Sequence, residues 1–193
     1  MNHLKSLMTY FSVIILAYLT SRLLEYDTFV YAWITLPGTA LHEAFHFLMA
    51  VLLNGHPSSI SVIPTPLYID NELIGIMLGN VLYKPNSYNT VAVGLAPLLM
   101  LPAVVFFVHA CVKTKSKSLS LSMFYFYVIV CLFAGCEPSS IDIDGMSKDI
   151  VSQVLGFGII GLGMIVVLVL SIMGISKYNH AVKNTFMGNS SPN

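Results

Sequence analysis

The chain has 193 residues, of which 56% are hydrophobic and only 9% are charged, and its mean hydropathy is +0.79. Soluble domains carry about a quarter charged residues, so the composition excludes an ordinary water-soluble domain and indicates one membrane-embedded domain over residues 1–193. Nine basic residues balance nine acidic ones, which argues against a nucleic-acid partner. The cysteines at 111, 131 and 136 lie in or beside apolar runs and predict lipid- or core-facing thiols with no disulfide framework.

Several apolar runs approach the roughly 20 residues that a membrane-spanning helix needs. The first, residues 7–24, follows a lysine as a signal peptide would, but no small-residue cleavage site follows it and we expect a retained span. The others are residues 29–53, 90–112, 119–136 and 151–176. The predicted fold class is therefore an all-α polytopic membrane protein with about five transmembrane helices.

Residues 58–89, between the second and third runs, are apolar but too interrupted for a helix. Pro64 and Pro66 break the segment early, and the Asp70-Asn71 pair is typical of a turn. Isoleucine and valine dominate around that pair, which predicts a short β-rich hairpin. Open sheet edges cannot face lipid, so we expect this loop at the membrane interface or lining a cavity.

The stretch PGTALHEAFHFLMAVLL, residues 37–53, places His42, Glu43 and His46 in an otherwise oily run. These residues fit H-E-x-x-H, and residues four apart share one face of a helix, about 6 Å apart along its axis. Both imidazoles can then bind one Zn²⁺, while Glu43 serves as general base and acid. Counted along a spanning helix, the motif lies roughly 12–13 Å inside the membrane, where ionisable residues mark functional sites. A structural zinc or a proton relay is the alternative.

A catalytic zinc usually has three protein ligands, and the acids of CEPSSIDIDGM offer the third: Glu137, Asp142 or Asp144. Ser139 followed by Asp142 also fits a capping box at a helix start, and Asp144 precedes a glycine as in an ordinary turn. The residues alone leave the choice open. Because the fourth run ends near residue 136, this segment is expected to dip back toward the metal.

The other histidines and acids have no evident place in this set. His56 lies ten residues beyond His46, which suits no common ligand spacing, and His109 near the end of the third run is expected at the interface. Asp70 and Glu72 fit the predicted hairpin turn better than a metal site.

The order of PGTALHEAFH (residues 37–46), a β-rich loop, GLAPLL (residues 94–99) and PSSID (residues 138–142) resembles the site-2 protease family. The likeness is to the small bacterial branch that consists of little more than the catalytic core, and it covers about residues 30–150. Better-known members carry Gly-Pro-x-x-Asn in the span after the β-loop. Residues 94–99 supply no asparagine, which puts substrate positioning or full activity in doubt.

The resemblance implies a multi-pass protein of the bacterial inner membrane that hydrolyses peptide bonds of membrane or membrane-proximal protein substrates. It implies Zn²⁺ as cofactor, held by His42, His46 and an aspartate from a later span, with Glu43 catalytic. Asp142 is the acid that completes the PSxxD pattern of this branch, so it is the expected third ligand.

Other interpretations compete with this one. A non-proteolytic pseudoprotease or binding subunit would fit the missing asparagine, whereas the intact H-E-x-x-H argues against it. A metal transporter would need ionisable residues spread along a path across the membrane, whereas here they cluster at one depth and in one loop. Membrane orientation is also contested: the basic turn at residues 113–118 is cytosolic by the positive-inside rule, but the resemblance places the β-loop on the cytosolic side.

Overall fold

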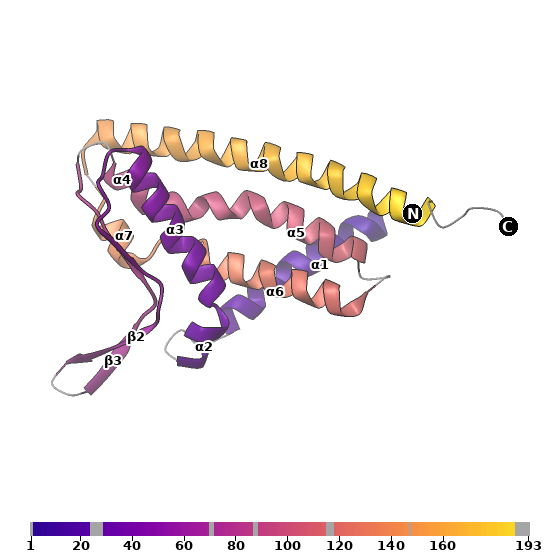
Figure 1. Cartoon of the computed structure of the whole chain (residues 1–193), viewed down its shortest axis with the longest axis horizontal. Helices are drawn as coiled ribbons and strands as arrows, with labels where there is room; N and C mark the ends of the chain where they lie inside the picture. Colours follow the sequence, from indigo (N-terminus) through magenta and orange to yellow (C-terminus); the bar gives the residue numbers. More distant parts are fainter. Residues whose placement is uncertain are drawn as a thin grey trace.

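The computed structural model describes residues 2–23, 29–69, 72–86, 89–114, 118–146 and 148–187. The chain is mostly helical, at 75%, as the composition predicts (Figure 1). The helices are α1 (Asn2–Leu23), α2 (Phe29–Ile34), α3 (Leu36–Leu52), α4 (Thr90–Gly94), the 3₁₀ helix η1 (Ala96–Met100), α5 (Leu101–Thr114), α6 (Leu119–Gly135), α7 (Ser140–Asp144) and α8 (Ile150–Met187). The strands are β1 (Ser59–Ser61), β2 (Thr65–Ile69), β3 (Glu72–Met77) and β4 (Asn80–Leu82).

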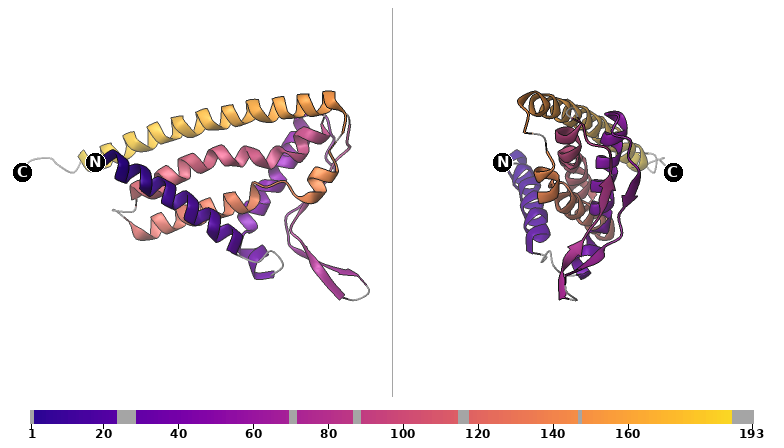
Figure 2. Two further views of the ribbon diagram at one scale, coloured as in Figure 1. Left: turned by 180° about the vertical axis from the view of Figure 1, so that it is seen from behind. Right: turned by 90° about the vertical axis from the view of Figure 1, so that its left-hand side faces the viewer.

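Three long helices, α5, α6 and α8, run lengthwise through the molecule, whereas α3 crosses steeply at one end (Figure 1). The strands, α4 and α7 gather at that same end, and α1 begins and α8 finishes toward the opposite one (Figure 2). α5 packs against both α6 and α8, and α1 packs against α6. The core shared by α1, α5, α6 and η1 includes Met100, Val108 and Ile129, whereas Ile160 of α8 lies in a second cluster. The three cysteines are free and buried.

Two helical segments, Ala96–Thr114 and Ile150–His180, are long and apolar enough to cross a membrane, and two shorter helices are also apolar. The run expected as one helix over residues 29–53 is instead broken at Thr35 into α2 and α3. Pro37 lies in the first turn of α3, and its missing N–H removes a bond that a continuous helix would need. The third predicted run is likewise broken, into α4, η1 and α5.

The predicted β-rich hairpin is confirmed. β2 and β3 pair antiparallel and project from the helical body (Figure 1), and the Asp70-Asn71 turn between them lies outside the described residues. Pro66, expected to break the segment, lies within β2 opposite Ile76, as proline can in an edge strand. A second sheet pairs β1 with β4 and starts a few residues after α3, so the β-loop begins and returns beside this helix.

α3 and α6 cross at two glycines. A Cβ on Gly38 would overlap the backbone carbonyl of Cys131, and a Cβ on Gly135 would overlap the carbonyl oxygen of Gly38. Both overlaps involve backbone atoms, so no side-chain rotation could relieve them. Small residues permit such close approach between helices, and here the contact seats the last turn of α6 against the turn of α3 that precedes His42.

We predict that Gly38→Ala pushes α3 away from α6 and lowers the free energy of unfolding, by about 1–3 kcal/mol as overpacking typically does. Thermal unfolding of the purified protein in detergent measures the loss. The matched control is Gly158→Ala in α8, where an added Cβ meets nothing within 4 Å and alanine favours the helix by roughly 0.5–1 kcal/mol. Equal stability of the two variants would contradict the close crossing.

Candidate metal centre

His42 and His46 lie on one face of α3, one turn apart, as the H-E-x-x-H spacing predicts. Their ring centroids are 4.5 Å apart, and their Nε2 atoms face each other at 2.9 Å. The two side chains are only 12% and 6% exposed. α3 therefore presents two imidazole nitrogens, shielded from solvent, within reach of a single ion.

Asp142 is the acid that the fold brings to this pair. Its Oδ2 lies 3.5 Å from Nε2 of His42, and its Oδ1 lies 3.3 Å from Nε2 of His46. The Ser139 hydroxyl accepts the N–H of Asp142, while Asp142 Oδ2 accepts the N–H of Ser139. The predicted capping box is thus present, and the capping acid is also the expected third ligand. The cap fixes the carboxylate before any ion binds.

The other two acids of this segment do not join the cluster. Glu137 pairs with Arg22 at the end of α1, and Asp144 is exposed. The path of PSSID from α6 to the two histidines is short. Because α3 crosses the C-terminal end of α6, the His42 ring contacts Gly135, the last residue of α6, and Asp142 follows within one short helix.

Each imidazole is oriented by a backbone carbonyl. Nδ1 of His42 lies 2.8 Å from the Gly135 oxygen, and Nδ1 of His46 lies 2.7 Å from the Val93 oxygen. A carbonyl oxygen can only accept, so each Nδ1 donates, and the Nε2 of each neutral ring then carries a lone pair. Two lone pairs facing each other at 2.9 Å, beside a carboxylate, repel unless a cation lies among them. Either a proton between the two Nε2 atoms or a metal ion would relieve this repulsion, and the donor set can hold such an ion.

The spacing of these atoms suits a tetrahedral ion. The ligand atoms all lie within 4.8 Å of one another, so His42, His46 and Asp142 could hold a metal ion. Two ligands that each bind zinc at about 2.0–2.1 Å lie about 3.3 Å apart in tetrahedral geometry, close to the observed separations of 2.9, 3.3 and 3.5 Å. Two nitrogens and a carboxylate fit zinc better than Mg²⁺ or Ca²⁺, which prefer oxygen ligands.

Glu43 lies beneath the β-rich segment. Its side chain is buried, at 5% exposure, and a Cβ on Gly79 would lie 2.7 Å from its Cγ and Oε1 and 2.9 Å from the Ser61 oxygen. A side chain at position 79 would therefore have to displace the carboxylate. Gly79, between β3 and β4, lets the backbone lie directly against Glu43, a role that the sequence did not reveal.

Asp142 carries its negative charge into this site. Burial acts to raise the pKa of its carboxyl, whereas positive charge on the side of the two histidines and the N–H that Ser139 donates to Oδ2 act to lower it, and the net pKa lies below the usual value. Tyr83, just after β4, was not predicted as a site residue. Burial raises the pKa of its phenol and the Asp142 charge raises it further, so the phenol stays protonated near the cluster.

The remaining candidates lie elsewhere. His56 is exposed beyond the end of α3, in the left-handed region at φ 44°. His109, near the end of α5, contacts the Tyr10 hydroxyl and Asn179 Oδ1, each at 3.0 Å, and ties α1 and α8 to α5. Glu72 begins β3, and Asp70 lies outside the described residues.

No protein-family model, curated protein or solved structure matches this chain. The resemblance to the site-2 proteases therefore depends on the order of the sequence motifs. Independently of that resemblance, the fold brings His42 and His46 together with Asp142, which lies nearly a hundred residues further along the chain.

We predict that Asp142→Ala loses most bound zinc because two histidines alone leave the ion short of its third protein ligand. Metal analysis of the purified protein measures the loss. Asp144→Ala should keep the metal, since that side chain is exposed on the same short helix. Ser139→Ala is the second control: it removes the cap, worth about 1 kcal/mol, but leaves the carboxylate. Metal loss in Asp144→Ala with retention in Asp142→Ala would refute this ligand assignment.

Proposed function

We propose that this chain is an integral membrane zinc metalloprotease of the site-2 protease type, which hydrolyses peptide bonds of membrane or membrane-proximal proteins. The observation that carries the proposal is the convergence of His42, His46 and Asp142 at one point on α3, next to a buried Glu43. Two nitrogens, one carboxylate and an adjacent glutamate form the residue set that metal-assisted peptide hydrolysis requires.

Zinc, when bound, supplies a Lewis acid that polarises the scissile carbonyl and acidifies water. Glu43 takes a proton from the attacking water as its oxygen bonds to the carbonyl carbon, and then passes that proton to the leaving amine as the C–N bond breaks. His42 and His46 keep their Nε2 lone pairs directed at the ion because both Nδ1 protons are held by carbonyls. The β-rich segment over Glu43 limits access of bulk water to the carboxylate.

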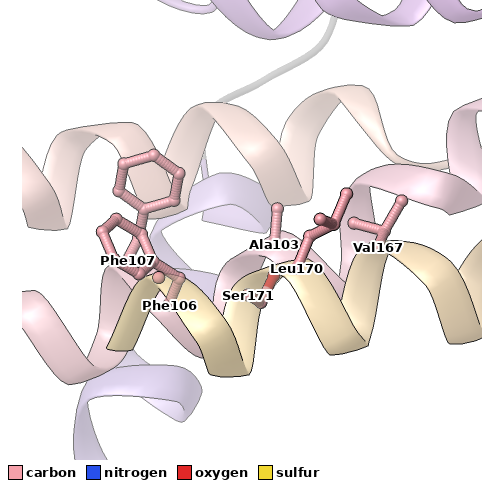
Figure 3. A pocket seen from close by; sticks show the side chains of 7 residues that line it. Ala103, Phe106, Phe107, Val167, Leu170 and Ser171 are labelled. Atoms are coloured by element: carbon pink, nitrogen blue, oxygen red, sulfur yellow. The ribbon is translucent and has the colours of Figure 1, made fainter. Parts of the chain in front are cut away.

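A membrane environment is supported by the exposed apolar surface. Only 17% of the most apolar window of Ile150–His180 is buried, which leaves a long oily helix without a protein partner on most of its circumference. A groove of about 290 Å³ between α5 and α8 is apolar apart from one hydroxyl (Figure 3). It is lined by Ala103, Phe106, Phe107, Val167, Leu170, Ser171 and Gly174. Lipid would cover such surfaces, and we propose that five spans place the chain in a bacterial inner membrane.

The β-loop offers a way to present a substrate. Among the described residues each sheet has two strands, and an extended peptide can add to the outer edge of such a sheet. β1 and β4 lie beside α3 near the metal ligands. A substrate strand held there would expose its scissile carbonyl, which a helical substrate would hide in its own hydrogen bonds.

Within residues 94–99, Gly94 matches the glycine of the family's Gly-Pro-x-x-Asn pattern and lies against α7. A Cβ on Gly94 would lie 2.8 Å from the Met146 Cε and 3.0 Å from the backbone carbonyl oxygen of Asp142. This glycine thus seats α7, which carries Asp142, against α4. We infer that this part of the chain serves metal-ligand placement, and that substrate is held mainly by the β-loop.

We predict that Glu43→Gln leaves zinc bound and abolishes proteolysis because it preserves the side chain's shape but removes the base. Zinc content and cleavage of a model transmembrane peptide, measured on the same purified sample, test this. Retained cleavage by the variant would refute the mechanism. Wild-type protein that binds zinc but cuts no membrane peptide would instead support the non-proteolytic alternative.

A separate prediction concerns topology: the β-loop and the end of α5 lie on opposite membrane faces, because they lie at opposite ends of the helical body (Figure 1). Single cysteines at Lys84 and Lys113, both exposed, would be labelled from outside with a membrane-impermeant maleimide. Only one should react, and which one reacts decides between the positive-inside rule and the family resemblance. The unaltered chain, whose cysteines are buried, is the negative control. Equal labelling of both sites would overturn the five-span arrangement.

A further inference from the structure

We propose that Pro97 is a positioning residue of the metal centre: by lacking a backbone N–H, it leaves the Val93 carbonyl able to hold the His46 ring. The inference deepens the proposed function and depends on the same metal site. It assigns a role to a residue that contacts neither the ion nor substrate.

Val93 lies at the end of α4, just before the chain reaches Pro97. In an α-helix the oxygen of residue 93 would accept the N–H of residue 97, but proline has no N–H to donate. One backbone N–H at the end of α4 does reach the Val93 oxygen, and Nδ1 of His46 reaches it at 2.7 Å. A carbonyl oxygen has two lone pairs, so both are then used. An N–H at position 97 that followed the α-helical direction of α4 would compete for this oxygen as a third donor.

Burial makes this competition costly. Val93 is 1% exposed, Pro97 is among the fully buried residues, and the His46 side chain is 6% exposed. An imidazole N–H that lost its acceptor here would have little access to water as a replacement partner, and a buried unpaired donor is strongly unfavourable. The ring would turn or move its proton to Nε2, and that proton would block the ligand atom.

The same arrangement recurs at His42. The α-helical donor to the Gly135 oxygen would be the N–H of Ser139, but that N–H is directed to Asp142 Oδ2 at 2.7 Å. The tighter, 3₁₀-type donor would be residue 138, which is again a proline. The Gly135 oxygen is thereby left to accept from Nδ1 of His42 at 2.8 Å. His46 is thus oriented by the Val93 carbonyl, four residues before Pro97. His42 is oriented by the Gly135 carbonyl, three residues before Pro138.

The test compares Pro97→Ala with replacement of Pro97 by lactic acid, the α-hydroxy analogue of alanine, in the full-length protein in detergent. The two variants share a side chain, but only alanine brings an N–H. In metal-free protein, ¹⁵N-histidine NMR reports the tautomer of each ring, and His46→Gln identifies the His46 signals. Competition with a chelator gives the zinc affinity of each variant.

Wild type and the lactic acid variant are expected to hold His46 with its proton on Nδ1 and to bind zinc within about threefold of each other. Pro97→Ala is expected to lose that tautomer and about 10–100-fold in zinc affinity, as changes to groups that orient metal ligands typically do. Pro102→Ala is the matched control: this proline is also buried, in α5, and the N–H it lacks would face Leu98, away from both histidines. It should retain the wild-type tautomer and affinity.

Equal tautomers and affinities in Pro97→Ala and wild type would overturn the inference, and so would equal losses in the alanine and lactic acid variants, since the ring would then matter more than the missing N–H. If Pro97→Ala does not fold, the lactic acid variant decides: retention of the Nδ1 proton supports the inference and its loss refutes it. If neither accumulates, an Nε2 proton on His46 in wild type refutes it and an Nδ1 proton supports it. None of these readouts requires proteolysis, so an inactive wild type would count against the proposed function alone.

Discussion

The close crossing of α3 and α6 is the constraint on which the candidate site depends. Gly38 and Gly135 let two backbones meet without intervening side chains, and this contact places the end of α6 beside His42. The chain then turns through residues 136–139 into α7, and Asp142 arrives 3.3–3.5 Å from the two imidazole nitrogens. A wider crossing would separate the third ligand from the first two, however well each local element was formed.

The site is held mainly by backbone groups. Two carbonyls fix the histidine rings, a capping box fixes the aspartate, and glycine at 79 lets a strand segment lie against Glu43. Backbone groups have few ways to move once their helices pack, so such partners orient ligands firmly. This explains how two histidines, a glutamate and an aspartate persist in an oily chain: each is paired or oriented, and a bound cation would relieve the remaining repulsion.

Local sequence patterns predicted what depends on local geometry. The spacing of His42 and His46, the Ser139–Asp142 capping box and the β-hairpin all follow from contacts within a few residues. The steep path of α3 could not be read from run length, because it depends on glycine contacts with a helix nearly a hundred residues away. The breaks at Thr35 and around Pro97 did have visible signals, since prolines stand in both runs, but hydropathy outweighed them. Gly79 and Tyr83 act through tertiary contacts with Glu43 and Asp142, so the local sequence pattern could not predict their roles at the site.

A bound ion would join two parts of the site that are far apart along the chain: the histidines of α3 and the aspartate of α7. His46 and Asp142 are nearly a hundred residues apart in the chain, and joining the ends of a long loop is where a metal ion constrains the unfolded chain most. α7 is a single short helix, anchored by its cap and by packing of Met146 and the Asp142 backbone against Gly94. The histidines are oriented by α4 and α6 without the ion, whereas a bound ion would add a further contact to α7 through Asp142. Binding of an ion would therefore also strengthen the docking of α7, with the carbonyl-held histidines as the fixed half of the site.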